Sequence, residues 1–368
     1  MARLNAPLHG LRQLAASRWL RALVTAGLLA LVLDQIHLGK AGSRLAHGHW
    51  ALFAAATALV LAALLLAAIR WRLFLCAGGI ERSRIEATRA YMIGAFTTNF
   101  LPSQLGGDVT RAWIAGGPGA RSRALATVAI DRATLFGCLI VAGWVVYAAD
   151  PAPVPHELVA ALAAASAALA LAGVLAVVVA LGGARLRHRL PETVQGPAGD
   201  IGEALRGCAN AALLLKTTLI GLVYQALILC AVWLLAQSID VDVAFSVLAV
   251  TLPPVLILTT LPISIGGFGV REAGFVVLLG RAGVAATDAT LVSLLIAAAF
   301  ALASLPGGVL LLLSSARGSV AAAQADQAEQ EGCEEHLDSG DDRGGGEDRE
   351  LLLGQGAEPS RDPGAHEN

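Results

Sequence analysis

The sequence predicts an all-α, polytopic membrane protein with about six transmembrane helices and two re-entrant, broken-helix hairpins arranged as an inverted repeat. Three observations support this fold. Of the 368 residues, 56% are hydrophobic and only 15% are charged, whereas a soluble domain carries about 25% charged residues. Several apolar runs reach roughly 18 residues, the length that marks a membrane span. Finally, one short motif occurs in both halves of the chain.

The motif combines a proline, two glycines and an arginine at constant spacing. Residues 97–111 read TTNFLPSQLGGDVTR, and residues 257–271 read ILTTLPISIGGFGVR. The shared positions are Pro102, Gly106, Gly107 and Arg111 in the first copy, and Pro262, Gly266, Gly267 and Arg271 in the second. We expect Pro and Gly to interrupt a membrane helix and free backbone groups that must be buried in protein or face a water-filled cavity. Two such breaks in matching positions indicate a transport site. A chance similarity between Gly-rich apolar segments does not account for the constant spacing.

The first half of the chain is predicted to begin inside the cell. Residues 1–19 are basic and are expected to form a cytoplasmic N-terminus. A first membrane repeat then covers residues 20–150, with an uncleaved span favoured over a signal peptide at its start. Its spans are predicted at 20–38, 51–69 and 124–148, and its re-entrant segment, at 90–116, enters from the cytoplasm. Five arginines are expected in a cytoplasmic loop between the second span and this segment: Arg70, Arg72, Arg82, Arg84 and Arg89.

A second membrane repeat is predicted over residues 151–317. Its spans are expected at 158–181, 212–236 and 289–313, and its re-entrant segment, at 246–282, enters from outside. Because each repeat holds an odd number of spans, the second runs through the membrane upside down relative to the first. Two full spans at 246–282 would weaken this symmetry.

The end of the chain differs in charge from the rest. From residue 321 onward there are 14 Asp and Glu and 3 Arg, a net charge of −11, so the preceding 320 residues carry +9. Residues 318–368 are too polar to pack a core, and we expect an acidic, disordered cytoplasmic tail. Basic residues are nearly all arginine, which with the high Ala and Gly content indicates a bacterial inner membrane, with both termini cytoplasmic.

No cofactor, metal or catalytic residue is predicted. The five cysteines form no CxxC pair and fit small buried hydrophobes. No phosphate-binding loop of the GxxxxGK[ST] type occurs, so ATP coupling within this chain is not expected. The expected partner is a membrane lipid as substrate, and no nucleic acid. A separate synthase or other partner protein, and a homo-oligomer, are left open.

Arg111 is the first candidate for substrate binding. A charged residue within a membrane is costly and is by default a functional hypothesis. Its planar fork of donors suits phosphate, and the freed amides of a helix start would add to an anion site. Alternatively, Arg111 reaches the cytoplasmic interface or pairs with Asp108. Arg271 and Glu272 make the matching pair, with a local ion pair at a helix start as the alternative.

Asp131 and Arg132 lie next to each other within a predicted span. Neighbours on a helix point in different directions, so at least one must face the protein interior. Asp131 is expected to pair with Arg111 or to hold a cationic headgroup, and a purely structural pair is an equal alternative. The full set of candidate substrate-binding residues is Asn99, Pro102, Gly106, Gly107, Asp108, Arg111, Asp131, Arg132, Pro262, Gly266, Gly267, Arg271 and Glu272.

These motifs resemble the membrane domain of the lysylphosphatidylglycerol synthase/flippase family over roughly residues 15–315. The resemblance rests on Asn99 to Arg111, on Asp131-Arg132 and on Leu261 to Glu272. It implies an inverted repeat with re-entrant helices. Members of that family make aminoacylated phosphatidylglycerol with a soluble C-terminal domain and move it to the outer leaflet with the membrane domain. Only the acidic tail follows residue 317 here, so the translocating part alone is implied.

The leading hypothesis is a flippase-like transporter that moves a charged-headgroup lipid, a phospholipid or an aminoacylated phospholipid, between leaflets. The alternatives are a membrane enzyme acting on a lipid-linked substrate, such as a glycosyl transferase, and a non-transporting scaffold. In the enzyme, Asp108 or Asp131 would act as base or metal ligand, but no Asp-x-Asp pair lies on a predicted cytoplasmic loop. Loss of function on deletion of the tail alone would favour the scaffold.

Overall fold

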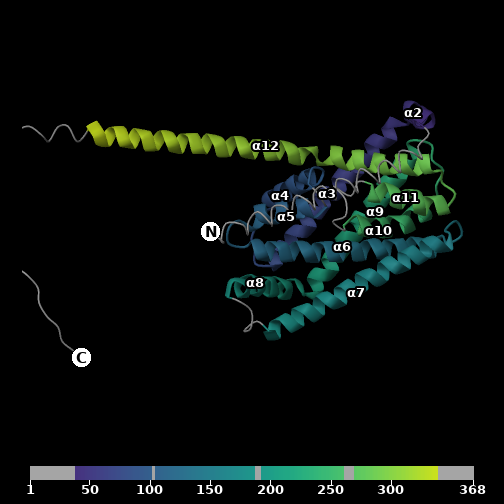
Figure 1. The fold of residues 1–368 in the computed structure, drawn as a ribbon, viewed down its shortest axis with the longest axis horizontal. Coiled ribbons are helices and arrows are strands. Elements are labelled where there is room, and N and C mark those ends of the chain that lie inside the picture. Colours follow the sequence, from purple (N-terminus) through teal and green to yellow (C-terminus); the bar gives the residue numbers. More distant parts are fainter. Residues whose placement is uncertain (1–37, 102–103, 187–191, 261–268, 339–368) are drawn as a thin grey trace, which may run out of the picture. The chain divides into compact units, whose positions relative to one another are not determined.

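The computed structural model describes residues 38–101, 104–186, 192–260 and 269–338, and these are folded into helices without a strand. The predicted all-α class is confirmed. The helices are α2 (Leu38–Ala46), α3 (Trp50–Ala77), α4 (Arg84–Thr98), α5 (Gln104–Gly116), α6 (Arg121–Ala149), α7 (His156–Leu186), α8 (Glu192–Cys208), α9 (Ala211–Gln237), α10 (Phe245–Thr259), α11 (Val270–Arg281) and α12 (Ala286–Asp338) (Figure 1).

Five segments of the described residues are long and apolar enough to cross a membrane. They are Trp50–Ala77, Arg121–Ala149, His156–Leu175, Ala211–Gln237 and Ala286–Ser314. Each coincides with one of the six predicted spans, so the polytopic membrane fold is confirmed. The other predicted span, 20–38, lies outside the described residues.

Two pairs of short helices occupy the predicted broken segments. In the first, α4 and α5 pack against each other, and in the second, α10 packs against α11. Both α4 and α10 have 15 residues, about 22 Å of helix, which is less than the roughly 30 Å of bilayer hydrocarbon. This length fits the predicted re-entrant hairpins. Their depth in the membrane and the inversion of the second repeat stay predictions.

The glycines of the first motif lie where the sequence did not place them. Gly106 and Gly107 are inside α5, which begins at Gln104, so the break precedes them. A Cβ added at Gly107 would overlap the Thr98 hydroxyl and the Gly94 carbonyl of α4. Gly107 therefore lets the two helices of the hairpin approach closely, as small residues do in membrane helix pairs, rather than freeing backbone groups.

Arg70 also differs from its expected place in a cytoplasmic loop. Helix α3 continues past the predicted end of the span at residue 69 and runs to Ala77, and Arg70 within it is fully buried. The run Trp71 to Ala77 is apolar apart from Arg72, so the helix continues through both arginines.

Residues 313–368 form a compact unit separate from residues 1–312. Within this unit α12 extends to Asp338, so the first part of the segment expected to be disordered is helical. The Ala-, Gln- and Glu-rich sequence there has a high helix propensity, which needs no buried core. Residues 339–368 lie outside the described residues.

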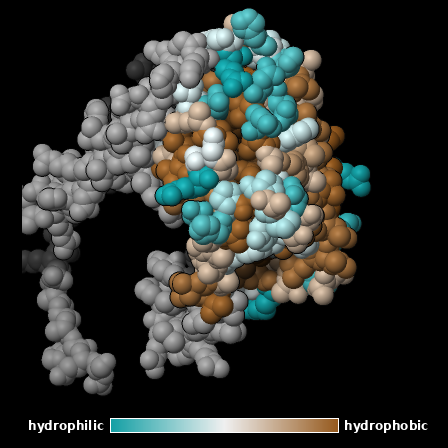
Figure 2. Space-filling view, turned by 90° about the vertical axis from the view of Figure 1, so that its right-hand side faces the viewer, coloured by the Kyte–Doolittle hydropathy of each residue, from teal (hydrophilic) through white to brown (hydrophobic). Residues whose placement is uncertain are grey.

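The helices of residues 38–312 pack around a core of Ala, Leu and Val side chains. Helix α3 packs along α9, while α6, α7 and α10 contact one another (Figure 1). Apolar side chains also cover much of the surface in Figure 2, and Leu171 of α7 and Leu312 of α12 are each 70% exposed. Such an apolar exterior suits a lipid environment.

Candidate functional site

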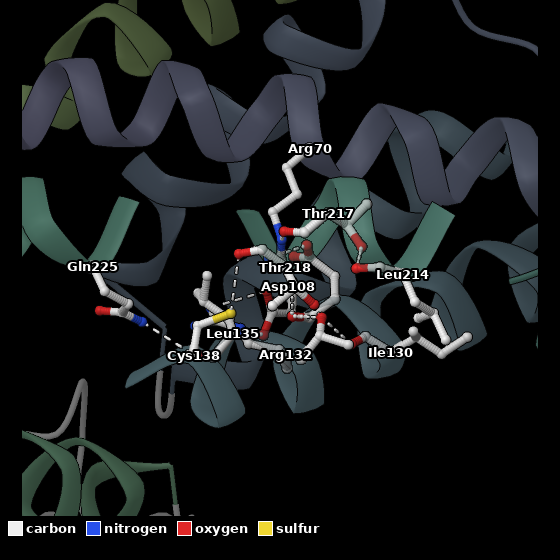
Figure 3. Close-up of polar contacts among 12 residues, drawn as sticks. Arg70, Asp108, Ile130, Arg132, Leu135, Cys138, Leu214, Thr217, Thr218 and Gln225 are labelled. Atoms are coloured by element: carbon white, nitrogen blue, oxygen red, sulfur yellow. Dashed lines mark hydrogen bonds and ion pairs between the residues drawn. The ribbon is translucent and has the colours of Figure 1, made fainter. Parts of the chain in front are cut away.

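Five charged side chains from α3, α5 and α6 meet between the helices of the first half. We call Arg70, Asp108, Arg111, Asp131 and Arg132 the Arg–Asp cluster. Four of them are at most 5% exposed, and the Arg132 side chain is 29% exposed. Figure 3 shows Arg70, Asp108 and Arg132 converging on one region between the helices.

Arg70 fixes one side of Asp131. Its Nη1 donates to Asp131 Oδ1 at 2.8 Å, and its Nη2 donates to the Asp131 backbone carbonyl at 3.1 Å and to the hydroxyl of Thr134. Its Nε donates to the Thr217 carbonyl of α9 at 3.0 Å. Arg70 therefore uses all of its nitrogens to join α3, α6 and α9, as a buried arginine must.

Arg111 links the two aspartates of the cluster. Its Nη2 lies 3.1 Å from Asp131 Oδ2 and 3.0 Å from Asp108 Oδ1, and its Nε donates to Asp108 Oδ1 at 3.0 Å. The guanidinium carbon lies 4.8 Å from the Trp71 ring centre and 4.7 Å from that of Tyr91, within cation–π range. Its buried Nη1 has no hydrogen-bond acceptor among the described residues.

Arg132 completes the cluster from α6. Its Nε donates to Asp108 Oδ2 at 2.7 Å and its Nη2 to Asp108 Oδ1 at 3.0 Å, which is the two-pronged arrangement that arginine makes with a carboxylate. Each aspartate of the cluster is thus shared between two arginines.

The second half carries a smaller polar group at the start of α11. Arg271 Nη2 lies 2.6 Å from Glu272 Oε1, and its Nε donates to the same oxygen at 3.2 Å and to Ser293 Oγ of α12 at 3.0 Å. The other carboxylate oxygen accepts from the Gly269 amide at 2.6 Å, capping the helix. Gly269 has φ of +84°, a conformation that glycine adopts without strain.

A single cavity of about 270 Å³ reaches both groups. Asp108, Arg111 and Arg132 of the cluster line it, and so does Arg271 of the second half. Its walls are otherwise largely apolar. The apolar lining comes from several helices and includes Leu64, Phe136, Ile228, Leu252, Phe275 and Phe300. A cavity with a few charged groups and otherwise apolar walls suits an amphipathic ligand.

The structure places the predicted site residues in three groups. Asn99, Gly107, Asp108, Arg111, Arg132 and Arg271 line the cavity. Asp131 and Glu272 pair with Arg111 and Arg271, which line the cavity, and Gly106 lies in α5 next to Leu101. The last four lie outside the described residues: Pro102, Pro262, Gly266 and Gly267.

The contacts of Asp131 include the predicted ion pair. Asp131 pairs with Arg111 as well as with Arg70, and both of its carboxylate oxygens are engaged. Its role in holding a cationic headgroup stays a prediction. Asn99 donates to Ser304 Oγ of α12 at 3.0 Å, joining the first hairpin to the last span.

Sequence reasoning missed three contributors to the site. The sequence pattern places Arg70 in a cytoplasmic loop. Trp71 and Tyr91 are single aromatic residues in apolar runs, and no motif marks them as site residues. Two sequence features indicate that Arg70 is buried. It directly follows an unbroken apolar span without a polar linker, and a further apolar run follows it. Among the described residues, no three His, Cys, Asp or Glu side chains are grouped as metal ligands.

Comparison with known protein families gives a match over most of the chain. The sequence model of the family described as "Lysylphosphatidylglycerol synthase TM region" matches residues 18–307. No match is found among curated proteins or among solved structures.

Proposed function

The chain belongs to the lysylphosphatidylglycerol synthase TM region family, and from this premise we propose that it moves a charged-headgroup lipid between the leaflets of a bilayer. Membership of the family indicates a membrane protein that acts on lipid. The transport activity, the bacterial inner membrane and the cytoplasmic position of both termini are part of the proposal.

The shared cavity is the observation that carries this proposal. Arg111 from the first hairpin and Arg271 from the second line the same space of about 270 Å³. Transporters built from two repeats place their substrate at the interface between the repeats, next to broken helices. The meeting of the two motif arginines in one cavity supports a single headgroup site of this kind.

The chemistry of the lining supports passage of a headgroup while the acyl chains stay in the bilayer. Arg111 and Arg132 attract the phosphate, and the apolar walls accept the glycerol and the first methylenes of the chains. An unsatisfied polar group in hydrocarbon costs several kcal/mol, and the arginines remove most of that cost. In the proposal the two hairpins open in turn to opposite sides.

The enzyme alternative is less well supported by the geometry. Asp108 is bound by two arginines and Glu272 by an arginine, an amide and a hydroxyl. A general base needs an oxygen within reach of the substrate proton, and the oxygens of both carboxylates are already engaged by protein donors. We therefore place lipid-linked glycosyl transfer second, and no contact of the described residues favours the scaffold.

The test is headgroup translocation by purified protein in proteoliposomes. A fluorescent anionic phospholipid is followed with a membrane-impermeant quencher. Wild type is compared with Arg111→Ala and with the double variant Arg271→Ala/Glu272→Gln, which removes both partners of the pair. The matched controls are Arg84→Ala and Arg281→Ala, since both side chains are exposed and lie on α4 and α11.

We expect protein-dependent translocation in wild type and in both controls, and a fall of about tenfold or more in both site variants, which corresponds to the loss of one charge-assisted contact. Folding is checked by gel filtration and thermal unfolding. Absence of translocation by folded wild type for anionic, zwitterionic and aminoacylated lipids alike would overturn the proposal.

A further inference from the structure

We propose that the cavity selects a phosphate headgroup that carries no cationic group, so that the substrate is a net-anionic lipid and not an aminoacylated one. This inference rests on the proposed function and narrows its substrate class. It starts from the charges around the cavity.

The polar groups at the cavity carry one excess positive charge. The Arg–Asp cluster holds three arginines and two aspartates, and Arg271 is balanced by Glu272. The segments next to the motif that the structure leaves undescribed, 102–103 and 261–268, contain no charged residue in the sequence. Among the described residues the excess charge around the cavity is therefore positive, and in a site of low dielectric it favours an anion.

Of the carboxylates that the structure describes at the cavity, none is available for a cationic ligand. Both oxygens of Asp108 accept from arginines, and so do both oxygens of Asp131. Glu272 is bound through one oxygen by Arg271 and Ser293 and through the other by the Gly269 amide. An ammonium group would have to break one of these pairs, which is costly for buried charges.

Donor capacity, in contrast, remains. The buried Nη1 of Arg111 has no acceptor among the described residues, and Arg132 uses only its Nε and Nη2 on Asp108 while its side chain is 29% exposed. Both residues line the cavity. A phosphate oxygen that accepts from Arg132 would use this donor capacity, while the buried guanidinium of Arg111 contributes its charge, and together they would neutralise the excess charge.

A cationic headgroup is disfavoured by the same charges and contacts that favour a phosphate. A lysyl ester adds two ammonium groups to one phosphate, so the headgroup enters a positively charged site with a net positive charge. Its amines would lose water without finding a carboxylate that is free of other partners among the described residues. The same geometry that binds the phosphate therefore excludes the amine.

The test compares two lipids in the same proteoliposomes, phosphatidylglycerol and lysylphosphatidylglycerol. We expect wild type to move phosphatidylglycerol at least about tenfold faster. Binding is measured in parallel in detergent, as the shift in thermal unfolding caused by short-chain forms of the two lipids. Inorganic phosphate is the third ligand and distinguishes a free anion from a headgroup, since only the lipid also contacts the apolar walls.

One substitution should change the preference without breaking an ion pair. Asn99→Asp adds a carboxylate to the cavity lining at nearly constant size and cancels the excess charge. We expect the ratio of phosphatidylglycerol to lysylphosphatidylglycerol transport to fall about tenfold or more. Asn99→Ala, which loses the same amide without adding charge, should keep the wild-type ratio.

The outcomes separate this inference from the proposed function. Equal transport of both lipids, or faster transport of lysylphosphatidylglycerol, overturns the charge selection and leaves translocation standing. No transport of either lipid, with a thermal shift for the anionic one only, overturns translocation and supports the selection. A shift from inorganic phosphate as large as that from the anionic lipid at equal concentration overturns the lipid as the ligand.

Discussion

The two hairpins share a backbone pattern but hold their charges in different ways. In the first half, each aspartate is bound by two arginines, and the bridges join α3, α5 and α6. In the second half, Glu272 is paired with one arginine of the described residues, its neighbour on α11, and with Ser293 of α12. The first arrangement is a shared network, and the second is a local pair.

The difference teaches that symmetry of sequence does not imply symmetry of energetics. In a shared network, losing one arginine leaves each aspartate with another cation. In a local pair, losing the arginine leaves a fully buried carboxylate without one. The network ties three helices together, whereas the pair constrains mainly the start of α11. We therefore expect the second hairpin to move at lower cost.

The largest effect on stability is expected for Arg271→Ala. It leaves Glu272 buried without its cation, and breaking a buried pair in this way costs about 3–5 kcal/mol. Adding Glu272→Gln should recover most of that loss, because no charge is then left unpaired. Thermal unfolding of the purified variants in detergent measures both steps. If Arg271→Ala alone is as stable as wild type, the expected difference in stability between the local pair and the shared network is contradicted.

Gly107→Ala should have the next largest effect, because the added methyl overlaps Thr98 and Gly94 in the partner helix. Overpacking of a close contact typically costs about 1–3 kcal/mol. Gly137→Ala in α6 is the matched control, since a Cβ there meets nothing within 4 Å. The same unfolding assay applies, and equal behaviour of the two variants would show that α4 and α5 are not closely packed.

A smaller effect on stability is expected for Arg132→Ala. Asp108 keeps its bonds from Arg111 and the Arg132 side chain is 29% exposed, so the cost should be about 1.5 kcal/mol, the lower end of the range for a hydrogen bond to a charged group. The main effect of Arg132→Ala should be on transport of an anionic lipid, because Arg132 lines the cavity and is the most exposed of the three arginines in the cluster. A stability loss as large as that of Arg271→Ala would refute the redundancy of the network.

Much of this architecture follows from the sequence. The length of the apolar runs predicted the five candidate spans that the structure describes. The repeated motif marked both hairpins and the two arginines, Arg111 and Arg271, that line the cavity. Pattern reasoning failed where packing between distant segments decides the outcome. Arg70 resembles a loop arginine until Asp131 of α6 is brought beside it. Gly107 of α5 resembles part of a helix break until α4 packs against it.

The cavity shared by both halves is tested most directly by filling it. In a variant without its native cysteines, Ala301→Cys places a thiol in the cavity lining, and Leu305→Cys places one a turn later on α12 at a side chain that is 50% exposed. Each is modified with the same bulky thiol reagent, quantified by mass spectrometry, and assayed for headgroup translocation. We expect modification at position 301 to abolish translocation and modification at position 305 to leave it intact. Full translocation by protein modified at position 301 would contradict a single path through this cavity.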